Sequence, residues 1–499
     1  MSEQPNPSST PKPAQPEPDT IGPASRRRRG SAATVAAVVA AVLLIVGGGV
    51  GLAAYRALSG GGTQPEKYAP ASSFAFAKID LDPAAAQKLA IRRFADKFPS
   101  SPTRKGSGNL RDDFVRKVFE GNGKVNYDRD IKPWLGDRAG VAGFLMGGKP
   151  TAELILQYKD KEQARRGLDK LAAEGGKLHY SLQDDYAVLA ESQSVVDEAV
   201  RQAAKSDLGG VSTYSKDVGE LTGSQVMTAW VDIERAVAAA RQNRAGGDRV
   251  PADLVNQAKG RLVIGVHAGD DYLEFEGATF DAPTTAASGA ATDMIRGLPD
   301  GTLAALSIGD PGQAVMAAFD GFRDTPGFSQ IAPNLNAIQQ ETGLKLPDDL
   351  ATLLGRSAVV ALGSVPSGGA GVPDVGLRSR PTDPGAGRKI AEQIAALARS
   401  SGGGVTVETQ QAGDDVILAV GNGYAGRLAA GGKLGGSKLF RTAMGDLPDK
   451  VSLATFVDLG ALLRNVSRDT EDARHLRAVG MSVRQDGKTQ RLRIRIVAG

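Results

Sequence analysis

The chain has 499 residues, no cysteine and a formal net charge of +4, with 41% hydrophobic and only 5% aromatic residues. Its length accommodates two to four ordinary domains. The lack of cysteine excludes a disulfide framework, a thiolate nucleophile, a cysteine-based zinc site and a lipidated cysteine. Five basic and three acidic residues give the first thirty positions a net charge of +2. The remainder is therefore close to neutral and lacks the electrostatic footprint of a nucleic-acid-binding protein.

Residues 1–29 form a proline-rich tail with almost no apolar side chains. Such a segment cannot bury enough surface to offset the entropy of ordering, so we expect it to be disordered. A docking or phosphorylation site in this tail is the alternative to a simple solvated leader.

Residues 30–55 predict one transmembrane helix. The segment holds no charged residue, and roughly 20 apolar residues suffice to cross a hydrocarbon core of about 30 Å. Arg26–Arg29 precede it and only Arg56 follows, so the positive-inside rule places residues 1–29 in the cytoplasm and the C-terminal part outside the membrane. A cleaved signal peptide is the alternative, but its apolar region is normally about 7–15 residues long. We expect a single-pass cell-membrane protein.

The rest of the chain reads as a spacer (56–67) and two copies of one module (68–281 and 298–499) separated by a linker (282–297). The copies share seven phrases in the same order. Each opens with an apolar strand ending in Asp-Pro (FAFAKIDLDP and LAALSIGDP) and continues through a Leu-Gly corner into a strand (WLGDRAGVAGF and LLGRSAVVAL). Each later has a hairpin at an acidic pair (DDYAVLA and DDVILAV), a strand-to-helix phrase (TAWVDIERAV and ATFVDLGALL) and a two-stranded ending. This order predicts a duplication.

A shorter repeat is found within the first copy, where AKIDLDPAAA resembles WVDIERAVAA, and the second copy has the corresponding segments. It suggests two β-α-β-β units per copy, bridged by an α-β-β-α segment. Strands are joined both by hairpins and by helices, and stretches such as KLHYSLQD and RLRIRIVA alternate with period two. The pattern predicts an α+β fold of largely antiparallel sheets, with helices packed over one face.

Gly421–Gly426, GNGYAG, follows a strand and precedes a helical run, as a dinucleotide-binding loop does, and Asp446 lies twenty residues further on. The same junction in the first copy reads ESQSV, with no glycine, and the strand belongs to a hairpin. We interpret the motif as an ordinary helix start and expect no cofactor.

Asp82, Asp232, Asp310 and Asp458 resemble the paired carboxylates of glycoside hydrolysis or of a metal site. All four stand where a strand turns into a helix, and two precede proline. An aspartate at such a position accepts a hydrogen bond from a free backbone N–H, so capping explains them without chemistry.

The three histidines, His179, His267 and His475, show no metal-ligand spacing, which argues against a catalytic triad or a zinc site. Trp134 and Trp230 lie in apolar phrases and are expected in the core. We assign no catalytic, cofactor-binding or metal-binding residue.

With its apolar anchor, Asp-Pro strand ends, Leu-Gly corners and V-D-[IL] phrases, the chain resembles domain-of-unknown-function family 3352, membrane-anchored bacterial proteins frequent in high-GC Gram-positive bacteria. The resemblance extends from about Tyr68 to the C-terminus and implies location and architecture but no activity. We expect a non-enzymatic binding or scaffolding module of the cell envelope, whose partner is an envelope protein or an apolar ligand. Two alternatives stay open: an apolar-ligand or lipid carrier, and a carboxylate-dependent hydrolase acting on envelope polymers.

Overall fold

The computed structural model describes residues 63–80, 85–99, 126–175, 178–242, 259–281, 291–323, 328–366, 371–400, 406–464 and 471–499. The predicted tail (1–29) and the predicted transmembrane helix (30–55) lie outside these residues. Among the helices within the described ranges, none has the length and apolar character needed to span a bilayer.

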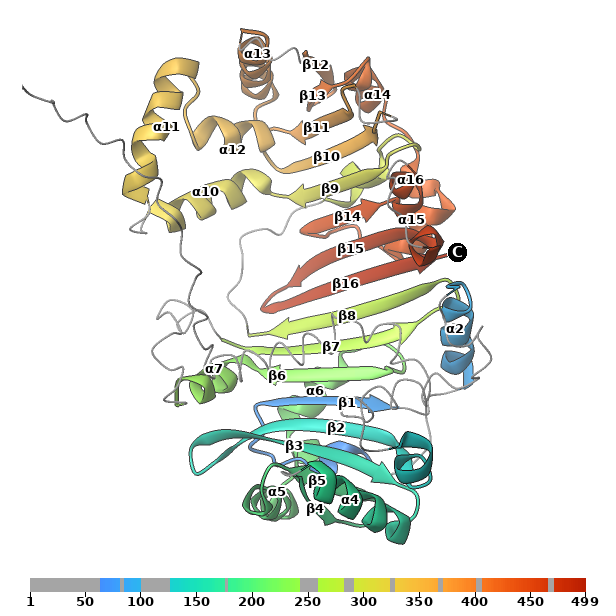
Figure 1. Cartoon of the computed structure of the whole chain (residues 1–499). Helices are drawn as coiled ribbons and strands as arrows, with labels where there is room; N and C mark the ends of the chain where they lie inside the picture. The colour runs from blue at the N-terminus through green and yellow to red at the C-terminus, as the bar shows by residue number, and fades with distance from the viewer. Residues whose placement is uncertain are drawn as a thin grey trace, which may run out of the picture.

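The described strands form one 16-stranded antiparallel sheet (Figure 1). The strands before residue 282 are β1 (Ala75–Asp80), β2 (Leu135–Met146), β3 (Lys149–Tyr158), β4 (His179–Leu182), β5 (Tyr186–Ala190), β6 (Met227–Asp232), β7 (Arg261–Ala268) and β8 (Tyr272–Phe280). Those after residue 291 are β9 (Ala304–Gly309), β10 (Ser357–Ser364), β11 (Asp374–Arg380), β12 (Val407–Ala412), β13 (Asp415–Val420), β14 (Leu453–Val457), β15 (Leu476–Asp486) and β16 (Thr489–Ala498).

The two halves of the sheet have the same strand order. Outward from the centre, the first half runs β8-β7-β6-β1-β2-β3-β5-β4 and the second runs β16-β15-β14-β9-β10-β11-β13-β12. β8 pairs antiparallel with β16 at the centre, with Phe275 opposite Ile494, and β1 with β6 and β9 with β14 pair likewise within the halves. The inner twelve strands therefore comprise four sets of three, each following the chain order strand, helical segment, hairpin. The phrases matched in the sequence lie on strands at corresponding positions.

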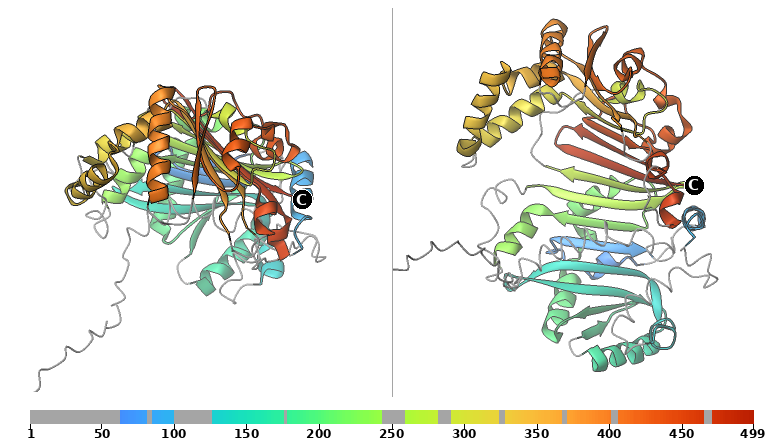
Figure 2. Two further views of the ribbon diagram at one scale, coloured as in Figure 1. Left: turned by 90° about the horizontal axis from the view of Figure 1, so that it is seen from above. Right: turned by 45° about the horizontal axis from the view of Figure 1, so that its top comes forward.

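Helices cover both faces of the sheet. The α15 face carries α5 (Gln193–Lys205), α6 (Ser212–Gly219), α9 (Thr292–Arg296), α14 (Tyr424–Ala430) and α15 (Lys438–Met444). The α7 face carries α2 (Ala85–Ala95), α4 (Lys161–Gly175), α7 (Ile233–Gln242), α12 (Asp348–Leu354) and α13 (Pro384–Ser400). α16 (Leu459–Leu463) follows β14, and α10 (Pro311–Arg323) and α11 (Phe328–Thr342) project from one side of the sheet (Figure 2).

The prediction of helices over one face is therefore wrong. β13 shows why: Ile417 and Ala419 pack against the α14 side, and the alternate residues Val416 and Leu418 pack against α13. A strand that is apolar at every position is buried on both faces. The two halves share one continuous sheet, because β8 pairs with β16.

The C-terminal part of the predicted linker (282–297) is helical. Its last residues form α9, and Met294 and Ile295 of this helix are buried in the core of the second half. The Pro, Thr, Ser and Gly residues of APTTAASGAA indicated a linker, but the apolar residues that follow them pack as a short helix.

α15 lies unusually close to the sheet because β15 carries a glycine beneath it. A Cβ atom at Gly480 would stand 2.2 Å from the carbonyl oxygen of Ala443 in α15. Ser437 caps the helix by accepting a hydrogen bond from the backbone N–H of Phe440 (3.1 Å), and Gly445 ends it with a φ of +60°. The end of α15 is thereby placed directly above β16.

Candidate functional site

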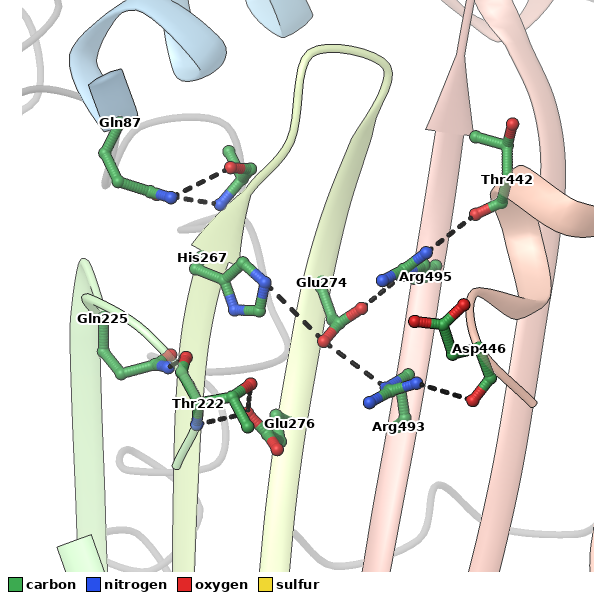
Figure 3. A network of polar contacts seen from close by, with 11 residues as sticks. Gln87, Thr222, Gln225, His267, Glu274, Glu276, Thr442, Asp446, Arg493 and Arg495 are labelled. Carbon is green, nitrogen blue, oxygen red and sulfur yellow. Dashed lines mark hydrogen bonds and ion pairs between the residues drawn. The ribbon is translucent and has the colours of Figure 1, made fainter. Parts of the chain in front are cut away.

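The seam between the halves, where β8 pairs with β16, carries a row of charged residues on the α15 face (Figure 3). Glu274 of β8 stands opposite Arg495 of β16, and Glu276 stands opposite Arg493. His267 of β7 lies opposite Glu274 from the other side. Alternate residues of a strand point to the same face, so these five side chains lie together.

Glu274 is the centre of this group, and only 1% of its surface is exposed. Its carboxylate accepts a hydrogen bond from Nε of Arg495 and lies 3.5 Å from Nε of Arg493. Arg495 also donates from Nη1 to the carbonyl oxygen of Thr442 at the end of α15 (3.3 Å), and its guanidinium lies over the ring of Tyr272 at 4.1 Å. Two cations thus compensate one buried anion and connect both halves of the sheet with α15.

His267 places Nε2 3.6 Å from Oε1 of Glu274, while its Nδ1 is buried without a hydrogen-bond partner. Burial lowers the pKa of His267 below its usual value, although the carboxylates of Glu274 and Glu276 oppose the shift. The imidazole is therefore neutral near pH 7. Glu276 accepts hydrogen bonds from the backbone N–H (2.9 Å) and the hydroxyl (2.7 Å) of Thr222.

The group has the donor types of a metal site, since ligand atoms of His267, Glu274 and Glu276 lie within 4.8 Å of one another. The neighbouring charges do not suit a metal. Two carboxylates and the guanidinium groups of Arg493 and Arg495 already balance to zero, and a divalent cation would add two uncompensated charges in a region of low dielectric. The chemistry of the group fits a structural ion cluster.

Two other buried carboxylates, those of Asp217 and Asp415, are held in the same way. Asp217 accepts hydrogen bonds from the indole of Trp230 (2.9 Å) and from Nε of Arg261 (2.7 Å). Asp415 binds Nε of both Arg378 (2.8 Å) and Arg380 (2.7 Å). A carboxylate whose oxygens are engaged by arginine donors suits a structural role better than that of a general acid.

Two of the four strand-end aspartates are helix caps, as predicted. Oδ1 of Asp232 accepts a hydrogen bond from the backbone N–H of Arg235 (3.0 Å), and Oδ1 of Asp458 accepts one from Ala461 (2.7 Å). Asp310 precedes α10 with a φ of +48°, and its backbone carbonyl accepts the hydrogen bond from Ala314. Asp82 lies outside the described residues.

The side chain of Asp310 lines an open cavity of about 650 Å³ at the end of β9. The other charged residues of its lining carry both signs: Asp293, Arg356, Arg378, Arg380, Asp414 and Asp415. Arg378 and Arg380 are occupied by Asp415. With four acidic and three basic residues, the lining has a formal net charge of only −1.

The glycine motif lies at a strand-to-helix turn, as interpreted. Gly421 and Gly423 have φ values of +114° and +64°, and Gly423 is the residue before α14. β13 pairs antiparallel with both β11 and β12, whereas a dinucleotide loop requires a parallel β-α-β unit. At the corresponding junction of the first half, Ser192 caps α5 through its hydroxyl. Asp446 accepts a hydrogen bond from Arg493 through its backbone carbonyl.

Both tryptophans are core residues, as expected, with no more than 2% of either exposed. The indole of Trp134 donates to the backbone carbonyl of Asp130 (2.7 Å). His179 begins β4 at the edge of the sheet, and the ring of His475 lies 6.4 Å from that of Phe98. The structure does not bring the three histidines together in one group.

On the α7 face, the same central strands carry no charged side chain over an area we call the open face. A single row of neighbours crosses it from Val360 through Leu306, Thr455, Met481 and Ile494 to Phe275. The open face consists of half-buried or exposed residues of six adjacent strands: Leu306, Ile308, Val360, Leu453, Thr455, Met481, Val483, Leu492, Ile494 and Phe275.

Three aliphatic residues of the open face are the most accessible: Val360 is 47% exposed, Leu306 38% and Leu492 36%. The helices α2, α4, α7 and α13 pack on the α7 face beside this area, where their neighbours are buried. The α15 face of these strands, in contrast, is covered by α9, α14 and α15. The open face is therefore an apolar surface at the middle of a long sheet.

Sequence reasoning missed both features of these strands. The signal for the seam was present, because YLEFEGATF alternates acidic with apolar residues and QRLRIRIVA alternates basic with apolar residues at the same period. Complementary charges in two strands of equal period indicate that the strands pair. Alternation within one strand, taken alone, indicates only that the strand has one apolar and one polar face.

The profile of the family described as "Protein of unknown function (DUF3352)" matches residues 34–181 and 175–456. No curated protein matches the chain. Among solved structures, crystal forms III and I of TP0453 are similar at 9% and 8% sequence identity. The matches cover 45% of this chain and 82% and 81% of TP0453, with a TM-score of 0.24 in both cases. The family profile covers more than half of the sequence, and the chain therefore belongs to this family of proteins of unknown function.

Proposed function

We propose that this protein is a membrane-anchored, extracytoplasmic binding or scaffolding module of the bacterial cell envelope, and that the open face is its binding surface. The open face is the observation that carries the proposal. Three of its residues, Val360, Leu306 and Leu492, each have more than a third of their surface exposed. Contiguous exposed apolar surface on a folded protein marks an interaction site.

The surroundings of the open face strengthen this reading. Glu274 of β8 and Arg493 and Arg495 of β16 point to the opposite face, where the carboxylate of Glu274 is buried against the two guanidinium groups. A strand with one solvated face normally turns its charged residues toward water. Here Glu274 is buried beneath α15, and aliphatic residues of the other face are left accessible, which suits a surface that receives a partner.

The anchor is proposed from residues 30–55, whose length and lack of charge fit a membrane span and whose flanking arginines orient it. The described chain begins at Thr63, only eight residues beyond Tyr55. Thr63 is already held against the folded domain, because its carbonyl accepts a hydrogen bond from the hydroxyl of Tyr186 (2.8 Å). A short connection of this kind keeps the sheet close to the membrane.

We propose further that the ectodomain arose by duplication of one module, with copies at 68–281 and 298–499. The identical strand order of the halves supports this origin. The charges at the seam then represent a divergence after duplication, since one copy contributes acidic residues to β8 and the other contributes basic residues to β16.

An envelope hydrolase is the competing proposal, and it requires two carboxylates that share one cleft. The buried carboxylates Glu274, Asp217 and Asp415 are instead occupied by arginines, and Asp232 and Asp458 cap helices. These contacts favour the binding module.

The proposal is tested in intact cells with a photo-crosslinking amino acid at Val360, and at Val372 as a matched control. Val372 is also 47% exposed, but it lies in the segment between β10 and β11, outside the open face. We expect an abundant crosslinked product from position 360 and little from position 372. Protease added to wall-stripped cells should degrade the chain beyond Arg56. Protection of that part from protease, or equal crosslinking at both positions, would contradict the proposal.

A further inference from the structure

We infer that the open face binds acyl chains of membrane phospholipids, an inference that rests on the proposed function and names the ligand. The first argument is chemical. Of the ten residues of the open face, only Thr455 has a polar side chain, and its hydroxyl oxygen is buried. The backbone groups of these inner strands are paired with their neighbours on both sides.

A surface without available donors or acceptors matches a ligand that needs none. A protein–protein interface contains about one hydrogen bond per 100–200 Å². Polar groups of a protein partner would find no hydrogen-bond partner on the open face, and burying them there would cost free energy. An alkyl chain has no polar groups to leave unpaired. Its binding is stabilised by dispersion contacts and by the removal of apolar surface from water.

The dimensions of the open face lead to the same ligand. Six adjacent strands span five spacings of about 4.8 Å, or about 24 Å. Each strand contributes at most two alternate residues, such as Met481 and Val483 of β15, and such a run of three residues extends about 10 Å along the other direction. The resulting footprint of about 240 Å² is less than a third of the roughly 800 Å² that each partner contributes to a stable protein interface. One leaflet of a bilayer core is about 15 Å thick, so an extended acyl chain fits within the longer dimension.

The first described residue, Thr63, lies close in the sequence to the proposed membrane anchor, and the membrane is a source of such a ligand. Thr63 lies eight positions after Tyr55, the last residue of the apolar segment, and eight fully extended steps of the chain reach about 28 Å. The sheet is therefore confined to the immediate neighbourhood of the bilayer, where phospholipid is the most abundant apolar molecule.

The test uses the full-length protein reconstituted into vesicles of phosphatidylcholine and phosphatidylglycerol that contain a phospholipid with a diazirine in its acyl chain. After irradiation, labelled peptides are identified by mass spectrometry. We expect labels on peptides that contain Leu306, Met481 or Ile494 of the open face, in addition to peptides from residues 30–55.

Val360→Lys and Leu492→Lys place an ammonium group on the open face at positions exposed enough to leave the fold intact. They should reduce labelling of the open face about tenfold, because a charge among alkyl groups is strongly disfavoured. Val372→Lys introduces the same charge at equal exposure outside the open face and should leave labelling unchanged.

The two proposals fail in different ways. Labelling of residues 30–55 alone, or labelling of the open face that Val360→Lys does not reduce, overturns the lipid inference and leaves the anchored module standing. If the open face is labelled while residues 30–55 are not, the anchor is wrong and the lipid surface is retained. A cellular crosslink from position 360 to a protein, with no lipid label on the open face, shows a protein partner and refutes the inference.

Discussion

Glu153 provides a quantitative test of the packing in the first half of the sheet. It lies on β3 opposite Ala142 of β2, with 2% of its surface exposed and neither carboxylate oxygen hydrogen-bonded. On the α15 face it shares its surroundings with Ile155 and Ala142, which belong to an apolar cluster. Burial raises the pKa of Glu153 from 4.5 to about 8.

The sign of the effect follows from proton binding. Between pH 4.5 and 8 the folded protein keeps a proton on Glu153 that the unfolded chain has released, so the free energy of unfolding falls as pH rises. Integrating between pH 5.5 and 8 for pKa values of 4.5 and about 8 gives a loss of about 3 kcal/mol, at 1.36 kcal/mol per pKa unit.

Glu153→Met replaces the carboxyl group with an apolar side chain of similar size, and this substitution should abolish the pH-dependent term. Urea denaturation of the wild type and the variant at pH 5.5 and 8 measures it as a difference of differences, in which all other titrating groups cancel. The variant should gain about 3 kcal/mol relative to wild type between the two pH values. Parallel behaviour of the two proteins would show that Glu153 is solvated or paired, and would refute the reasoning.

Two further substitutions test the seam and the glycine motif. Glu274→Gln leaves Arg493 and Arg495 without their anion and should lower the free energy of unfolding by about 3–5 kcal/mol. The control Glu220→Gln, in an ion pair closer to the surface, should cost less than about 1 kcal/mol. Equal costs of the two substitutions in urea denaturation would mean that the seam contributes no special stability. Gly423→Ala should cost about 1 kcal/mol because φ is +64°, and calorimetry should detect no saturable binding of NAD, FAD or ATP to the wild type. Micromolar nucleotide affinity that Gly423→Ala removes while melting changes little would show that the motif is a cofactor loop.

The sequence predicts local structure here better than the assembly of the sheet. Paired phrases such as TAWVDIERAV and ATFVDLGALL mark equivalent strands, because strand alternation and helix capping depend on residues near one another in the chain. The caps of Asp232 and Asp458 follow from the same local rule.

What joins the halves depends on residues more than two hundred positions apart. The pairing of Glu274 with Arg495 is visible only when two strands are compared for complementary charge. The open face is harder still, because Leu306 and Val360 have the alternation of ordinary buried residues, and only the positions of the helices show that they are accessible. Glu153 gives no local signal of burial without a partner.

The lack of cysteine allows the central claim, an extracytoplasmic module with an occupied open face, to be measured directly. Val360→Cys and Val372→Cys each introduce a single thiol at a position of equal exposure. With a membrane-impermeant maleimide on intact, wall-stripped cells, the thiol at position 372 should react without permeabilisation, and the thiol at position 360 should react several-fold more slowly. In the purified, delipidated protein both should react at similar rates. Reaction only after lysis would place the domain inside the cell, and equal rates at both positions in cells would show that nothing occupies the open face.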